Sequence, residues 1–128
     1  MKNKWSANWK SSKQPRKQRK YRINAPLHIK QKFVNAHLSK ELKKKHSRRA
    51  LALRKGDKIK IARGQFKGKT GKVDKINLSN YRVYVTDIMV AKKDGTKAFF
   101  PLHPSNLIIT ELILEDKKRQ KILDRKNK

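Results

Sequence analysis

Apolar residues recur with two different periods along this chain, and the period changes near residue 50. In the first part, Ile29, Phe33 and Ala36 are spaced by four and three residues. This spacing predicts a short amphipathic helix that begins at the Asn-Ala-Pro sequence of residues 24–26. A second short helix is expected to begin at Ser39, whose hydroxyl can cap it, and to end among lysines that suit a helix C-terminus.

After residue 50 apolar and polar residues alternate, which is typical of half-buried strands. The apolar parity changes between Val85 and Ile88, so a bulge or sharp bend is expected there. The Asp94-Gly95 pair predicts a hairpin turn. Five short strands spread over about sixty residues suit a small antiparallel barrel. They are expected around residues 59–61, 73–76, 81–90, 98–102 and 107–114.

The segments outside this region have fewer apolar residues. Residues 1–22 hold too few to bury anything, so this arm is expected to be disordered when free and to order on a partner. Residues 23–50 form the helical segment and residues 51–114 the barrel. Residues 115–128 form a charged tail whose only large apolar residues are Ile122 and Leu123. Two alternatives stay open for this tail: a short helix docked through those two residues, or a frayed end.

The charge of the chain indicates that this small barrel protein binds a polyanion. The 128 residues carry a formal net charge of +28, and residues 1–50 alone hold 17 Lys and Arg against one acid. Such a charge destabilises a free globule through self-repulsion. Nucleic acid is the first candidate partner, because each phosphate that Lys or Arg contacts also releases condensed counterions.

Composition also argues against several classes of protein. The chain has no Cys, which excludes disulfides and thiolate metal sites. No run of about 18 apolar residues exists, so no membrane span is expected. The four His are too scattered for a metal site, and the acids Asp57, Asp74, Asp87 and Asp94 are interpreted as turn-formers and local ion-pair partners. No catalytic cluster can be assembled, so neither an enzyme nor a cofactor is expected.

The glycine-rich segment of residues 58–73 is the most informative motif. It is expected to run strand, tight loop, strand, with glycines that permit positive φ and let another backbone approach closely. Basic residues surround these glycines, which suits a nucleic-acid backbone. An ordinary solvated hairpin loop is the alternative. The loop residues predicted to bind RNA are Arg63, Gly64, Lys67, Gly68, Lys69, Gly71 and Lys72.

Further RNA-binding residues are predicted outside the loop. Trp5 and Trp9 are four residues apart, on one face of a helix if the arm folds as one, and are predicted to stack on bases or ribose. Packing on a neighbouring protein or on the barrel is the alternative for both. The other predicted residues are Lys4, Lys10, Lys13, Arg16, Lys17, Arg19, Lys20 and Arg22 in the arm, Arg48, Arg49, Arg54 and Lys55 at the entry to the barrel, where they are expected to continue the basic run of the arm, and His103 in a Pro-bounded loop.

The segment of residues 58–73 resembles the KOW motif of ribosomal proteins and transcription elongation factors. Further matches lie at residues 24–29, 38–42, 52–57, 94–96, 103–110 and 121–126. Together they resemble the universal KOW-motif protein of the large ribosomal subunit, the L-twenty-four family. Two residues between Gly68 and Gly71, where many eukaryotic members have three, and the lack of a long charged C-terminal extension favour an archaeal member.

The resemblance implies a mainly β protein with an SH3-like barrel that binds large-subunit ribosomal RNA near its 5′ end. It also implies a role early in subunit assembly, a place near the nascent-chain exit tunnel, and neighbouring ribosomal proteins as partners. A monomer within the cytoplasmic ribosome is expected. The alternative is a KOW-domain elongation factor that contacts RNA polymerase, although the arm is too short and too polar to form the additional domain that such factors usually carry.

Overall fold

The computed structural model describes residues 4–125. Within them, three short helical elements precede the first strand, and one helix follows the last strand. The helical elements are η1 (Ala7–Ser11), α1 (Pro15–Asn24), α2 (Leu27–Phe33), α3 (Lys40–His46), η2 (Pro104–Asn106) and α4 (Lys117–Asp124). The strands are β1 (Asn35–Leu38), β2 (Ala50–Ala52), β3 (Lys58–Ile61), β4 (Thr70–Asn77), β5 (Arg82–Val85), β6 (Met89–Ala91), β7 (Lys97–Phe99) and β8 (Leu107–Glu111).

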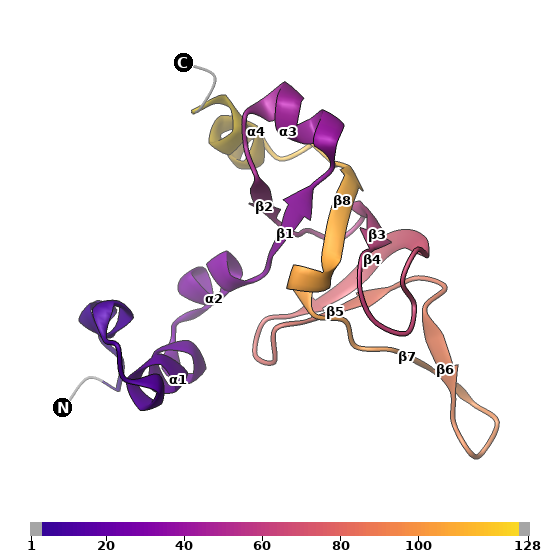
Figure 1. Ribbon diagram of the computed structural model, residues 1–128, viewed down its shortest axis with the longest axis horizontal. Coiled ribbons are helices and arrows are strands. Elements are labelled where there is room, and N and C mark those ends of the chain that lie inside the picture. Colours follow the sequence, from indigo (N-terminus) through magenta and orange to yellow (C-terminus); the bar gives the residue numbers. More distant parts are fainter. Residues whose placement is uncertain (1–3, 126–128) are drawn as a thin grey trace.

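Six strands pair in the order β2-β1-β8-β3-β4-β5, and β6 pairs with β7 in a separate ribbon. In Figure 1 this ribbon extends at the lower right, while α1 and α2 lie at the left and α3 and α4 at the top. The prediction of a mainly β protein is confirmed. The pairing is not purely antiparallel, because β1 runs parallel to β8. Nor do the strand pairings close into a barrel, because β6 and β7 pair with each other and leave the main sheet open.

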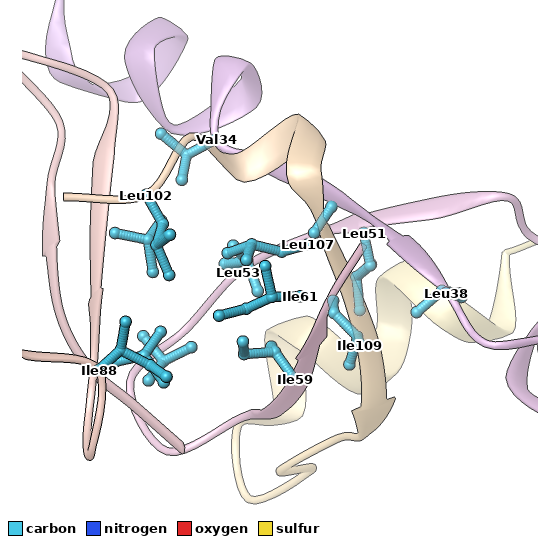
Figure 2. Packing of buried hydrophobic residues seen from close by; sticks show 14 of the residues in the cluster. Val34, Leu38, Leu51, Leu53, Ile59, Ile61, Ile88, Leu102, Leu107 and Ile109 are labelled. Atoms are coloured by element: carbon cyan, nitrogen blue, oxygen red, sulfur yellow. The ribbon is translucent and has the colours of Figure 1, made fainter. Parts of the chain in front are cut away.

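The core forms where strand alternation turns apolar residues to one side. Ile59 and Ile61 of β3 and Leu107 and Ile109 of β8 are at most 1% exposed. Figure 2 shows Ile59, Ile61 and Ile109 pointing into the same cluster, with Leu107 beside Ile61. The predicted period of two is therefore confirmed for these strands.

The predicted bend is also confirmed. Asp87 has φ of 68° in the left-handed region and separates β5 from β6, while Ile88 stays buried. The hairpin at Asp94-Gly95 closes through the Lys92 N–H, which donates to the Thr96 carbonyl at 2.7 Å. Asp94 and Gly95 therefore form the predicted turn of the β6–β7 ribbon.

The helix predicted from Ile29, Phe33 and Ala36 is confirmed for only part of its length. Helix α2 ends at Phe33, and Ala36 lies in β1. Ala36 and Leu38 are both 1% exposed, whereas Asn35 and His37, which alternate with them along the strand, are exposed. Three apolar positions at helical spacing do not distinguish a helix from a helix followed by a strand. The second helix, α3, is confirmed together with its cap, since the Ser39 hydroxyl accepts the Leu42 N–H at 3.3 Å.

The tail folds as α4 and docks on the strands. Leu123 is 2% exposed. The Arg119 guanidinium also donates two hydrogen bonds to the Asp57 carboxylate, at 2.7 Å and 2.6 Å. The sequence suggested that Asp57 pairs locally. Its ion-pair partner instead lies 62 residues away. We call this pair the Asp57–Arg119 clamp.

The arm contains secondary structure where the sequence predicted none. Tyr21 of α1 is 7% exposed and packs edge-on against Phe33 of α2, with ring centroids 5.8 Å apart. Phe33 in turn packs edge-on against Tyr81 at 5.7 Å. Aromatic partners from outside the arm therefore supply the burial that the arm's own composition lacks. The expectation that the arm is disordered when free stays a prediction.

Across residues 4–125, no helix is both long and apolar enough to cross a membrane.

Candidate nucleic-acid interface

The loop between β3 and β4 presents exposed backbone at two glycines. Gly64 and Gly68 have φ of +99° and +88°, and a Cβ added at either would meet no atom within 4 Å. The Gly68 N–H donates to the Ile61 carbonyl at 2.8 Å and the Lys67 N–H to the Gly64 carbonyl at 3.2 Å. These bonds fix a tight loop whose two glycines supply left-handed conformations and leave the outer side open.

Gly71 differs from the other two glycines and corrects the sequence interpretation. Its φ is not positive, and a Cβ there would lie 2.6 Å from Val85 Cγ1 and 2.9 Å from the Thr86 carbonyl oxygen. The space beside Gly71 is filled by β5. Its lack of a side chain therefore serves the close approach of β4 and β5.

An aromatic anchor holds the loop against the body. Phe66 is 8% exposed and packs edge-on against Phe100, with centroids 5.0 Å apart. Lys69 Nζ lies 5.1 Å from the centre of the Phe66 ring, a cation–π distance. The cations Arg63, Lys67, Lys69 and Lys72 are all exposed. The loop is thus fixed from within and basic on its outer side.

A groove of about 250 Å³ lies beside this loop, and we call it the loop groove. Arg63, Gly64 and His103, all predicted from the sequence, line it together. Arg82 lines it as well and was missed. The alternation of Tyr81, Val83 and Val85 placed Arg82 on the outer face, and this was the signal that could have identified it. None of the lining residues is acidic.

His103 carries a defined hydrogen-bonding pattern in this groove. Its Nδ1 accepts the Ser105 N–H at 3.3 Å and lies 2.7 Å from the Ser105 hydroxyl. Burial, followed by the nearby charges of Arg82 and Arg22, lowers the pKa of His103. A neutral ring that accepts at Nδ1 carries its proton on Nε2. His103 therefore keeps an N–H donor at Nε2 without adding charge.

Arg22 connects the arm with the body near this groove. Its guanidinium carbon lies 5.0 Å from the Tyr81 ring centre and 5.8 Å from that of Phe33. The Tyr81 hydroxyl donates to the Arg22 carbonyl. Since Arg22 also acts on the pKa of His103, the last turn of α1 extends the basic surface of the groove.

The two tryptophans do not share a helix face, which corrects the expected i, i+4 arrangement. Trp5 precedes η1 and stacks on Tyr21 at 5.4 Å with an interplanar angle of 30°. Its Nε1–H donates to the Tyr21 carbonyl at 3.1 Å. Trp9 is half-buried within η1. The predicted basic residues of the arm are all exposed: Lys4, Lys10, Lys13, Arg16, Lys17, Arg19, Lys20 and Arg22.

The basic residues before the strands lie apart from the loop groove. Arg54 pairs with Asp116 at 2.5 Å, and Lys55 lies 3.9 Å from Asp74. Arg48 and Arg54 line a different groove, beside α2 and α4. The sequence predicted that these residues continue the basic run of the arm, and that role stays a prediction. None of them is among the residues that line the loop groove.

Within residues 4–125, no three His, Asp or Glu side chains are grouped as a metal ion requires. Comparisons with known proteins found the following similarities. A family model that describes the ribosomal proteins L26 of eukaryotes and L-twenty-four of archaea matches residues 12–126. A relative from Methanosphaera stadtmanae, named "Large ribosomal subunit protein uL24", is 49% identical over 115 residues, which cover 90% of this chain and 98% of the relative.

Proposed function

The chain belongs to the family of eukaryotic L26 and archaeal L-twenty-four ribosomal proteins, and on that premise we propose that it is a structural constituent of the large ribosomal subunit that binds ribosomal RNA. The family resemblance extends the proposal to RNA near the 5′ end, early subunit assembly and a position near the exit tunnel. The protein acts there as a monomer among neighbouring ribosomal proteins in the cytoplasm. It performs no catalysis.

The loop groove is the observation that carries this proposal. Arg63, Arg82 and His103 converge there beside the exposed backbone of Gly64, with no acidic residue in the lining. Two guanidinium groups suit phosphate oxygens, which they can bind in a bidentate manner. A neutral imidazole N–H adds a donor for a phosphate, ribose or base acceptor. Contacts to phosphate and sugar position a protein on RNA largely through shape.

The arm supplies a second set of contacts in this proposal. Its exposed cations bind phosphates, and Trp9 is the tryptophan that reaches a base or ribose. Trp5, held against Tyr21, maintains the shape of the arm. Arg22 connects the arm contacts with the loop-groove contacts, because it belongs to the arm and its guanidinium packs against the Tyr81 ring.

The same family membership supports an SH3-like barrel as the underlying fold. Val83 and Leu102 exchange two backbone hydrogen bonds of 2.8 Å and 2.9 Å, which brings the chain after β7 to the free edge of β5. Strand β8 then pairs with β3. We assign this return of the chain as the closing side of such a barrel.

The proposal is tested by the salt dependence of RNA affinity. Binding of the full chain to a large-subunit RNA fragment is measured over a range of KCl concentrations. Each neutralised phosphate contributes roughly 0.7–0.9 to the magnitude of the log–log slope. An Arg63→Gln, Lys67→Gln variant is expected to lower this magnitude by about 1.4–1.8.

A Lys92→Gln, Lys93→Gln variant is the matched control, because it removes the same charge at the tip of the β6–β7 ribbon. It should change the slope much less. A flat salt response of the unaltered chain, or failure to co-sediment with large subunits, would refute the proposal.

A further inference from the structure

A second groove, of about 410 Å³, lies between α2, β2 and α4 and shares no lining residue with the loop groove. We propose that it is a separate binding site for the sugar–phosphate backbone of RNA, with α4 as one of its walls. The proposal rests on the proposed function and adds a site to it. We call it the α4 groove. Its basic lining residues are His28, Lys32, Arg48, Arg54 and Arg125.

Three of the four Lys and Arg side chains that line the α4 groove have no carboxylate partner within residues 4–125. No Asp or Glu is among its lining residues. Arg54 is paired with Asp116 at the edge, but among residues 4–125 no carboxylate forms an ion pair with Lys32, Arg48 or Arg125. Three cations around one cavity repel one another, and an anion placed between them removes that repulsion.

Arg48 contributes a cation whose guanidinium is only partly engaged by the protein. Its Nε is buried and has no hydrogen-bond partner within residues 4–125. An unpartnered buried donor on a charged group is unfavourable. A phosphate bound to the same guanidinium offsets that cost through charge-assisted hydrogen bonds. Arg119 Nε is also buried without a partner, but its guanidinium is paired with Asp57. Arg48 differs because no carboxylate within residues 4–125 pairs with it.

The chemistry of the cavity wall favours a nucleic-acid backbone. Beneath the cations lie Leu51, which is 5% exposed, and the partly buried Ile122. An apolar floor under a basic rim accommodates ribose carbons and phosphate oxygens in succession. The overall charge of +28 makes a polyanion the expected occupant. An acidic protein segment is the competing occupant that the experiment must distinguish.

The position of α4 depends on the Asp57–Arg119 clamp. Besides Asp57, Arg119 Nη2 donates to the Ala52 carbonyl at 3.1 Å, and Ala52 lines the groove. Arg119 thus connects β2 directly with the helix that carries Ile122, and Arg125 follows as the C-cap of that helix. A tail that frayed would leave the groove without this wall.

The test compares two triple variants of the full chain. One removes the groove cations through Lys32→Gln, Arg48→Gln and Arg125→Gln. The control removes three exposed lysines of α4 that lie outside the groove lining, through K117Q, K118Q and K121Q. Both lower the net charge by three. Circular dichroism and thermal melts establish that both remain folded.

Affinity for a large-subunit RNA fragment is then measured against KCl concentration. The groove variant is expected to reduce the magnitude of the salt slope by about 2.1–2.7, and the control by well under half of that. Hydroxyl-radical footprinting should show one protected RNA segment lost with the groove variant and retained with the control. Equal effects of the two variants would overturn the site, because overall charge would then account for binding.

Two further outcomes are decisive. If polyglutamate competes with RNA for the unaltered chain and the groove variant resists this competition while keeping its footprint, the occupant is an acidic protein and the proposal is wrong. If only the Arg63→Gln, Lys67→Gln variant of the glycine loop changes the slope, the proposed function survives and the α4 groove is refuted. A failure of the unaltered chain to bind RNA at all would overturn both.

Discussion

Replacing Arg119 with Ala is the most informative test of how the C-terminal helix is held. The side chain is 2% exposed and the Asp57 carboxylate 0%. The substitution deletes two hydrogen bonds to Asp57, one to the Ile113 carbonyl at 2.8 Å and one to the Ala52 carbonyl at 3.1 Å. It leaves a buried carboxylate that still accepts the N–H groups of Arg54 at 3.0 Å and Ile113 at 3.2 Å.

The expected loss of stability follows from that geometry. Removing one partner of a buried ion pair costs about 3–5 kcal/mol, because the other charge remains buried without compensation. Small domains have a free energy of unfolding of about 5–15 kcal/mol. The Arg119→Ala variant is therefore expected to lose a large share of its stability. The melting temperature should fall by roughly 12–20 °C, at about 4 °C for each kcal/mol.

Urea denaturation followed by circular dichroism measures this difference, at a salt concentration that screens the chain's self-repulsion. The matched control is Glu111→Ala, which breaks the exposed pair of Lys58 and Glu111, whose atoms are 2.8 Å apart. Exposed pairs contribute about 0–1 kcal/mol. If Arg119→Ala were no more destabilising than Glu111→Ala, the clamp would not hold α4 in the folded protein.

Two further predictions concern packing and pH. Gly71→Ala should cost about 1–3 kcal/mol by forcing a Cβ against Val85. Gly64→Asn should stay within about 1 kcal/mol in the same denaturation assay, because Asn tolerates the left-handed region; equal losses would contradict the two roles. Burial lowers the pKa of His46, so stability should be constant at higher pH and fall as the pH drops below about 6.5 towards that lowered pKa. His46→Gln should remove part of this fall, since His103 is shifted in the same direction, and an unchanged pH profile would refute the assignment.

Local signals predicted well where neighbours in the sequence decide the structure. Ser39 capped a helix as expected, and Asp94-Gly95 formed a turn, because both depend on a few adjacent residues. Gly64 and Gly68 likewise adopted positive φ within their own loop. Gly71 has the same residue type and a similar place in the motif, yet its role is set by Val85, which reaches it only when β4 pairs with β5.

Long-range partners account for the other differences. The sequence showed Arg119 as one cation in a charged tail and Asp57 as a turn residue, and nothing in their spacing of 62 residues indicated a pair. Tyr21 gained burial from Phe33, and Phe33 from Tyr81, so an arm with few apolar residues nevertheless contains helices. Arg82 lines the loop groove because β5 lies close to the segment that contains His103.

The sequence by itself determined the mainly β character, the basic surface and the family, because periodicity, charge and motif order are properties of the chain. Only the tertiary structure decided how the charge is divided. It grouped Arg63, Arg82 and His103 at one groove and Lys32, Arg48 and Arg125 at another, although the members of each group lie far apart along the chain. The physical reason is that strand pairing and a buried ion pair bring distant segments together, and neither interaction is encoded in the spacing of residues along the chain.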